Sequence, residues 1–408
     1  EISCSLVGSE MCIRDSLSGY NINPVDGGIA RITHTLAELF IESGHCVWYL
    51  GYRKVSDDDI RRQLYFPTGK PVATTENQNF LENVIVTKRI DVVIVQKNPC
   101  KAYLKMLHEC KKRHNFLIIS CFHNLILTQF YNYAYGVEYK LKKGKLAFIF
   151  SLLKNKWINQ LLVHIYIIKN KSLYQYIVDN SDVSVVLGEG HKNELLKMIG
   201  KKFDDSIQII PNCINETHMS RLEKTNEVLW VGNVDCSVKR IDFMIDIWDK
   251  IQIQHPDWTL RILGDGPSLQ EMKDKIRISN IKNICFEGRV IPNIYYERAK
   301  ILCVTSVHES FSLVTIEAKM HGVVPVVQDS FPMAREIVNN GVDGIIVRPF
   351  SLNDFCEKLN SLMDDDELIK RYSESAIISS QHYAPTRISA LWKSLFMRFT
   401  RAGLCTTR

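Results

Sequence analysis

The amino-acid sequence predicts an α/β protein with two doubly wound domains, each built on a parallel sheet. The first observation is length: the chain has 408 residues, and a single hydrophobic core stops growing beyond about 250–300 residues. The second is that apolar runs of strand length alternate with helical segments in both halves. Continuous apolar runs are typical of strands buried on both faces of a parallel sheet. We therefore expect two sets of strand–helix repeats.

The first domain is expected over residues 17–218, followed by a linker near 213–224. A helix opens after Asp26, Gly27 and Gly28, and apolar strand-length runs follow at 46–50, 91–96, 116–120, 183–187 and 207–210, with a helix at 102–112. Paired glycines before a helix let a ligand approach the backbone closely, and a plain tight turn is the alternative.

Residues 1–16 are set apart from this domain. They resemble the stray peptide that results when sequencing-adapter DNA is translated, and they have neither the basic start nor the cleavage site of a signal peptide. We expect this segment to be non-native and the native first strand to be missing.

The second domain is expected over residues 219–384. Its strands are indicated at 301–304, 323–327 and 345–347, and a helix runs from Leu313 to Met320 until Gly322 ends it. A last helix at about 385–402 has apolar residues at helical spacing. It is a candidate to pack on the first domain, and a core helix of the second domain is the alternative.

The segment from His308 to Glu317 carries the chemistry, because it places Glu309 and Glu317 eight residues apart across a helix start. Ser310 is a good N-cap, so the N–H groups of Phe311, Ser312 and Leu313 would form an anion site that suits a phosphate. A sugar nucleotide would fit, with its sugar near Glu309 and its ribose near Glu317. The alternative is a helix-start charge and a solvated residue.

This segment, followed by the strand Gly322-Val-Val-Pro-Val-Val327, resembles the signature of the family 4 retaining glycosyltransferases, which is Glu, seven residues, Glu, and then a Gly-x-Pro-Val strand. The resemblance extends through Val228–Asp242, Leu260–Pro267 and Phe286–Arg289, and covers nearly all of residues 226–350. It implies the GT-B fold, in which two Rossmann-like domains face each other across a cleft and the last helix returns to the first domain.

The resemblance also assigns residue roles. Glu309 would bind the donor sugar, Glu317 the ribose hydroxyls and Lys239 the diphosphate, while Gly232 and Gly264 lie in the first two strand–loop elements and Arg289 meets the base. Asn233 stands where the family has a second cation, so Arg240 or Arg289 would have to compensate. Ser312 replaces a commoner glycine, which is tolerable because the backbone N–H binds. In the first domain, Gly28 belongs to a glycine loop and His123 would reach the donor sugar.

By this resemblance the protein is a retaining, metal-independent glycosyltransferase without a cofactor. It would use a UDP- or GDP-sugar and a glycan or polyprenyl-linked acceptor in surface polysaccharide biosynthesis, as for lipopolysaccharide or capsule. Two alternatives stay open: a degenerate sugar-nucleotide-binding partner subunit, and a sugar-nucleotide 2-epimerase of the same fold. The acidic triplets at 57–59 and 364–366 have loop-like surroundings and indicate no metal site.

Composition adds a localisation and one interaction surface. The twelve cysteines have no metal or disulfide spacing, and the apolar runs are too short to span a bilayer, so a cytoplasmic protein is expected. Residues 101–175 hold thirteen Lys or Arg against two Glu, interleaved with aromatic residues. We expect the part at 140–171 to contact an anionic membrane at the inner face of the cell membrane. A solvated helix face and a nucleic-acid patch are the alternatives, and no nucleic-acid motif accompanies the patch.

Overall fold

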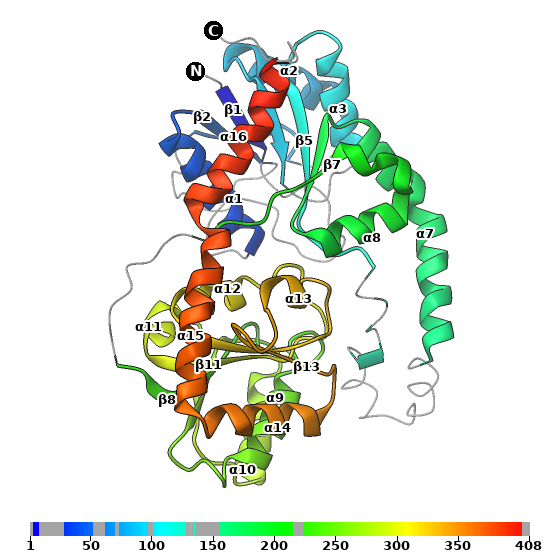
Figure 1. Cartoon of the computed structure of the whole chain (residues 1–408). Coiled ribbons are helices and arrows are strands. Elements are labelled where there is room, and N and C mark those ends of the chain that lie inside the picture. Colours follow the sequence, from blue (N-terminus) through cyan, green and yellow to red (C-terminus); the bar gives the residue numbers. More distant parts are fainter. Residues whose placement is uncertain are drawn as a thin grey trace. The chain divides into compact units, whose positions relative to one another are not determined.

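The computed structural model of the chain describes residues 3–7, 28–51, 62–69, 73–96, 101–127, 130, 132, 134–135, 155–214 and 223–401, with only the backbone described at 3–7, 156, 400 and 401 (Figure 1). Two compact units are present. The first comprises Glu1–Asn124, Ile167–Asn215 and Tyr383–Arg408, and the second comprises Leu125–Tyr166 and Glu216–His382.

The first unit is built on a seven-stranded sheet in the order β3-β2-β1-β4-β5-β6-β7. All of its strand pairs are parallel. The prediction of a doubly wound parallel domain is therefore confirmed. Its strands are β1 Ser3–Val7, β2 Cys46–Gly51, β3 Gln63–Tyr65, β4 Val92–Val95, β5 Leu117–Phe122, β6 Val183–Val186 and β7 Ile207–Ile209.

Strand β1 lies inside the segment that the sequence sets apart from the fold. Its residue Leu6 pairs with Tyr49 of β2 and with Ile94 of β4. The first unit thus begins before residue 17, the start that the sequence indicates, and Ser3–Val7 takes the place expected for a missing first strand. Whether the sequence of this segment is native stays a prediction.

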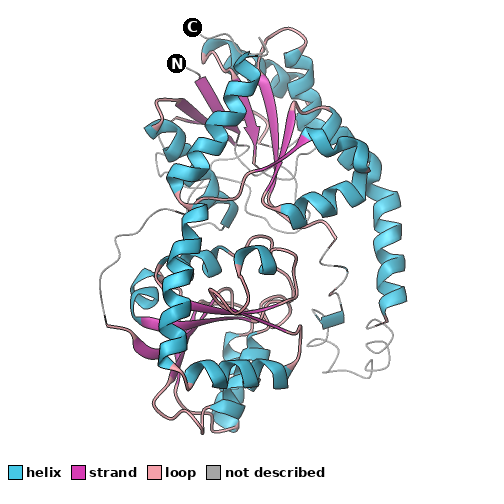
Figure 2. Cartoon of the chain, in the orientation of Figure 1, coloured by secondary structure: helices cyan, strands magenta, loops and turns pink. Residues whose placement is uncertain are grey.

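Helices cover both faces of this sheet (Figure 2). On one face α1 and α16 pack together, and the ring centroid of Phe40 lies 5.6 Å from that of Trp392 and 5.5 Å from that of Phe396. The C-terminal helix thus belongs to the core of the first unit. The helices of this unit are α1 Gly28–Glu42, α2 Thr75–Thr87, α3 Lys101–Lys111, α8 Glu189–Ile199, the 3-10 helix Lys201–Ser206, α16 Pro385–Arg401 and the C-terminal part of α7 Lys156–Asp179.

The segment Leu125–Tyr166 departs from the expected boundaries, because the structure assigns it to the second unit. The ring of Tyr135 stacks on that of Phe350 with centroids 3.7 Å apart. The division from the first unit falls inside α7, between Tyr166 and Ile167. Contacts between residues so far apart in the chain leave no signal in local sequence, so the predicted domain of 17–218 is too simple.

The second unit has a six-stranded sheet in the order β10-β9-β8-β11-β12-β13, again with parallel pairs. This confirms the second doubly wound domain. Helices lie on both faces of the sheet (Figure 2), and Trp248 of α9 is fully buried in the core. The strands are β8 Thr225–Val231, β9 Thr259–Leu263, β10 Ile284–Gly288, β11 Ala299–Val304, β12 Val324–Gln328 and β13 Ile345–Val347, and the helices are α9 Ile241–Ile251, α10 Leu269–Ile278, α11 Asn293–Arg298, α12 Leu313–Met320, α13 Ala334–Ile337, α14 Leu352–Met363 and α15 Asp366–Ser380.

In the described ranges, no helix combines the length and apolar character that crossing a membrane requires.

Candidate functional site

The loops that carry most of the candidate residues meet at one edge of the second unit's sheet. Strand β8 is first in the sequence, and its neighbours are β9 on one side and β11 on the other. The strand order therefore reverses between β8 and β11. Ligands of open α/β sheets bind outside the carboxyl ends of the strands at such a switch point. The loops after β8, β9 and β11 supply Gly232, Gly264 and Glu309 there.

Two glycines let the first two of these loops touch. A Cβ atom built on Gly264 would lie 1.8 Å from the carbonyl oxygen of Gly232, and Gly264 has a φ of +149°. The N–H of Gly264 donates to the carbonyl of Gly288 at the end of β10, over 2.8 Å. Only glycine at 264 permits this approach of backbones. The loops after β8, β9 and β10 are thereby fixed to one another.

Lys239 and Glu309 are brought together from loops 70 residues apart. The Lys239 ammonium donates to Glu309 Oε1 over 2.5 Å, and the Ser306 hydroxyl donates to the same oxygen over 2.6 Å. The Lys239 side chain is 25% exposed and that of Glu309 is 12% exposed. The site therefore presents a cation and a carboxylate that are both within reach of a ligand.

Three residues that the sequence did not single out hold these loops. Thr305 Oγ1 accepts from Trp230 Nε1 over 3.0 Å and donates to the Lys239 carbonyl over 2.9 Å. Asn132 Nδ2 donates to the carbonyl of Val307 over 2.8 Å. Together with Ser306 they support the backbone on either side of Glu309. A polar run after β11 signals a loop, but nothing in local sequence connects Asn132 to it.

Helix α12 has a different N-cap from the one expected. Its N-cap is Ser312 rather than Ser310, and the helix begins at Leu313. Ser312 has the left-handed backbone φ of 52°, which glycine adopts without strain. This explains why glycine suits the position, and the bond between the Ser312 and Thr315 hydroxyls compensates here. Phe311 and Ser312 are buried and precede the helix, so only Leu313 of the expected N–H groups lies in its first turn.

Glu317, Arg289 and Arg240 have different surroundings. The Tyr296 hydroxyl donates to Glu317 Oε2 over 3.3 Å. Arg289 is exposed just after β10. Arg240 is buried, and its guanidinium donates to both carboxylate oxygens of Asp242. An arginine held in this way helps to fix its loop, and its role as a replacement for the family's second cation stays a prediction.

In the first unit, His123 follows β5 and Gln96 follows β4. Gln96 Oε1 can only accept, so the 2.7 Å bond places the imidazole proton on Nε2 of His123. Burial, with a smaller contribution from His191, lowers the pKa of His123 to about 4. The imidazole is therefore neutral near neutral pH. Gly28 is exposed as the first residue of α1, while Gly27 lies outside the described residues.

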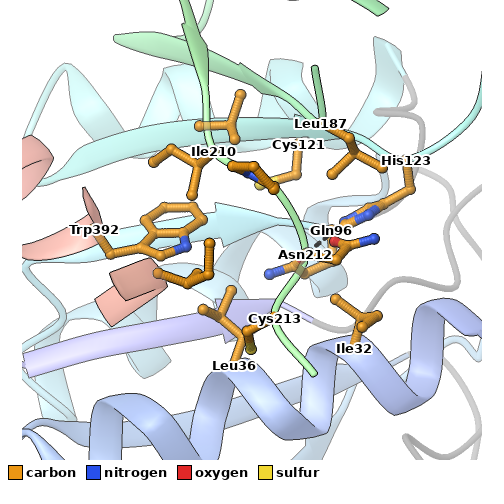
Figure 3. Close-up of a pocket in the computed structure, with 13 residues that line it drawn as sticks. Ile32, Leu36, Gln96, Cys121, His123, Leu187, Ile210, Asn212, Cys213 and Trp392 are labelled. Atoms are coloured by element: carbon orange, nitrogen blue, oxygen red, sulfur yellow. Dashed lines mark hydrogen bonds between the residues drawn. The ribbon is translucent and has the colours of Figure 1, made fainter. Parts of the chain in front are cut away.

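His123 also lines a largely apolar pocket within the first unit (Figure 3). Side chains reach it from α1, α16 and the strand ends, with Trp392 on the side opposite His123. Its lining includes Ile32, Leu36, Gln96, Cys121, Leu187, Ile210, Asn212 and Cys213.

The remaining expectations concern metals and thiols. Asp365 caps α15 by accepting from the Leu368 N–H, while residues 57–59 lie outside the described ranges. In the portion of the chain that the structure describes, no group of three or more His, Cys, Asp or Glu side chains is placed to hold a metal ion. The eight cysteines whose side chains the structure describes are free thiols.

Comparison with protein families finds a similarity in the second unit. Residues 216–378 match the family model of the Glycosyl transferases group 1. The chain is 28% identical over 219 residues to the amylovoran biosynthesis glycosyltransferase AmsD of Erwinia amylovora, a match that covers 52% of this chain and 61% of AmsD. A second relative is the GalNAc-alpha-(1->4)-GalNAc-alpha-(1->3)-diNAcBac-PP-undecaprenol alpha-1,4-N-acetyl-D-galactosaminyltransferase of Campylobacter jejuni, 26% identical over 45% of this chain and 51% of the relative. The chain thus spans about half to three fifths of the length of these relatives.

Solved structures confirm the predicted fold. The apo form of the lipopolysaccharide outer core galactosyltransferase WaaB superposes with a TM-score of 0.68 at 14% identity, over 97% of this chain and 99% of that one. The complex of Anabaena HepE with UDP gives a TM-score of 0.69 at 11% identity, over 98% and 100%. The chain has the two-domain GT-B fold.

Proposed function

We propose that this protein is a retaining glycosyltransferase that moves a sugar from a nucleoside diphosphate donor to a glycan or lipid-linked glycan in surface polysaccharide biosynthesis. The observation that carries the proposal is the Lys239–Glu309 pair at the switch point of a group 1 glycosyl transferase domain. A cation and a carboxylate side by side suit a substrate that has a diphosphate next to a polyhydroxylated sugar.

We assign stabilisation of the leaving diphosphate to Lys239 and to the start of α12. Negative charge builds on the diphosphate as the bond to the sugar breaks, and fixed positive groups at that point lower the barrier. The Lys239 ammonium, which donates to Glu309 in this structure, is the side chain that we assign to this task. The N–H groups of Leu313 and Val314 at the positive end of α12 are a second source of positive potential.

We assign orientation of the donor to Glu309, Glu317 and the loops that meet at Gly232 and Gly264. Glu309 is held by Ser306 through one carboxylate oxygen and would accept from sugar hydroxyls. Glu317 would accept from the ribose hydroxyls while Tyr296 holds its carboxylate. Gly232 and Gly264 allow the donor close to the backbone, and Arg289 would lie at the base. From the first unit, His123 is proposed as a neutral group for the donor sugar, with Gly28 at the glycine loop.

The chemistry of the donor and acceptor is proposed from the relatives. HepE was solved with UDP, so UDP-sugars are the first donors to test and GDP-sugars the second. The name of AmsD points to an extracellular polysaccharide, and that of the Campylobacter jejuni enzyme to an undecaprenol-linked glycan. We propose an acceptor of this class, a metal-independent reaction and a cytoplasmic location at the inner membrane face.

The test is calorimetric titration of the chain with UDP, GDP, ADP and their common sugars. We expect one nucleotide to bind and both Lys239→Ala and Glu317→Ala to weaken it about tenfold or more, which is about 1.4 kcal/mol each. Lys370→Ala and Glu374→Ala on the exposed part of α15 are matched controls, because they remove the same charges from the same unit. A folded protein that binds no nucleotide would contradict the proposal.

Turnover then separates the open alternatives. Sugar transfer with retained anomeric configuration, insensitive to a metal chelator, is the expected result. Epimer formation without an acceptor would indicate a 2-epimerase, and nucleotide binding without turnover against a range of acceptors would indicate a degenerate partner subunit.

A further inference from the structure

Helix α7 has two apolar faces. The first is buried: Val163, Ile177 and Val178 are at most 3% exposed. Tyr174 on the same face stacks on Phe122 of β5, with ring centroids 6.3 Å apart. These residues hold the helix to the protein, so the second face is not needed for that purpose.

The second face is a stripe of exposed apolar side chains, which we call the α7 stripe. It consists of Trp157, Leu161, Ile165 and Ile168, whose exposed fractions are 80%, 58%, 52% and 67%. Intervals of four, four and three residues place all four on one side of a helix, opposite the buried set. At about 1.5 Å per residue the stripe extends for about 16 Å along the helix.

The stripe differs from the other exposed apolar residues. Ile253, Ile278 and Ile378 are as exposed, but they lie on three separate segments of the second unit. Val290, Ile291 and Ile294 form a group within five residues, which is shorter than the stripe. Single exposed apolar residues are ordinary on protein surfaces, whereas a contiguous row that water solvates poorly indicates an interaction surface.

Charge identifies the kind of partner. Residues 139–178 contain eight lysines and neither aspartate nor glutamate. Two of these lysines, Lys169 and Lys171, are exposed on α7 itself, one on each side of the stripe. The partner should therefore be both apolar and anionic. A second copy of this chain would bring the same lysines face to face, which disfavours self-association.

We propose that the α7 stripe docks on the surface of an anionic lipid bilayer, with the apolar side chains in the head-group region and Lys169 and Lys171 against acidic lipids. Helices with an apolar face and flanking lysines bind in this way. Trp157 at one end of the stripe is of the residue type that favours the interface. The proposal rests on the surface of α7 and not on the sugar-nucleotide site.

The experiment uses the full chain with vesicles of phosphatidylethanolamine and phosphatidylglycerol, and with neutral phosphatidylcholine vesicles for comparison. All six tryptophans lie in the described residues, and Trp157 alone is exposed. We expect co-sedimentation with the acidic vesicles that salt weakens, and a blue shift of the fluorescence that disappears in Trp157→Phe.

Two triple variants decide the result. Leu161→Gln with Ile165→Gln and Ile168→Gln should lower vesicle binding about tenfold or more, while Ile253→Gln with Ile278→Gln and Ile378→Gln should not. Both variants should bind nucleotide as the unaltered chain does. A failure of the membrane proposal can therefore be told apart from a failure of the proposed function. Equal vesicle binding by both variants overturns the proposal. If the stripe variant binds vesicles as the unaltered chain does and differs from it only in molecular mass by light scattering, the stripe binds a second copy of the chain. That result also overturns the proposal.

Discussion

Gly264 shows at the residue scale how strongly one backbone position can constrain the site. Its hydrogen sits where any side chain would meet the carbonyl of Gly232. The sequence indicated this glycine only through the family resemblance. A Leu-Gly-Asp-Gly run does not show which other part of the backbone Gly264 will contact. The contact arises when parallel strands β8 and β9 bring their carboxyl ends together.

We predict that Gly264→Ala destabilises the second unit by about 3 kcal/mol or more, because overpacking adds to backbone strain. Nucleotide affinity should fall with it. Gly44→Ala is the control, since Gly44 has a φ of +88° but open space around its Cβ position. The strain alone should cost about 1–2 kcal/mol. Thermal unfolding and nucleotide titration measure both, and equal effects of the two substitutions would disprove the steric explanation.

His123 makes the stability of the first unit depend on pH. Burial lowers its pKa from the ordinary 6.5 to about 4. Between these values the unfolded chain takes up a proton that the folded chain does not. The free energy of unfolding therefore decreases as the pH falls from about 6.5 to about 4, by an amount of the order of 3 kcal/mol.

We predict that His123→Gln removes this component. Thermal midpoints measured between pH 7 and pH 4 should fall less steeply in the variant than in the unaltered chain. Replacement of the exposed His164 by glutamine should leave the slope unchanged. Parallel slopes for the unaltered chain and His123→Gln would show that His123 takes up its proton equally in the folded and unfolded states.

At the scale of elements, α16 shows a helix whose role depends on where it packs. Ile388, Trp392, Leu395 and Phe396 recur at helical spacing, and this pattern predicts the helix. It does not say which of two apolar cores they enter. The contacts of the Trp392 and Phe396 rings with Phe40 of α1 place the helix in the core of the first unit. Phe40 lies more than three hundred residues away in the chain, so local sequence does not reveal these contacts.

We predict that Phe396→Ala lowers the stability of the first unit by about 3–5 kcal/mol, through lost burial and the cavity that remains. The neighbouring Met397 is 44% exposed, whereas Phe396 is 3% exposed. Met397→Ala should change stability by less than about 0.5 kcal/mol. Urea unfolding followed by near-ultraviolet circular dichroism checks the pair, and similar losses in both would place the buried face of α16 elsewhere.

At the scale of the whole molecule, the parallel sheet of the first unit depends on a strand from the first seven residues. Strand β1 is central, so it supplies the hydrogen bonds of β2 on one side and of β4 on the other. Residues 3–7 also lie in the segment that the sequence analysis set apart from the first domain.

We predict that deletion of residues 1–7 leaves the first unit unfolded or aggregated, because two unpaired strand edges would be exposed at the centre of its sheet. Deletion of residues 1 and 2 alone should be tolerated. Limited proteolysis and circular dichroism distinguish these results. A shortened chain as stable as the full one would mean that this sheet closes without Ser3–Val7.

The sequence by itself determined two doubly wound α/β domains, most strand positions and the segment with Glu309 and Glu317, because these depend on local apolar runs and on spacing along the chain. The GT-B arrangement of the two domains was expected only from the family resemblance. Only the tertiary structure decided that Lys239 bonds to Glu309, that Asn132 and Thr305 support their loops, and that Ser312 rather than Ser310 caps α12. It also decided that residues 125–166 belong with the second unit. The physical reason is that these contacts join residues distant in the chain or depend on single backbone angles, and neither leaves a periodic pattern in the amino-acid order.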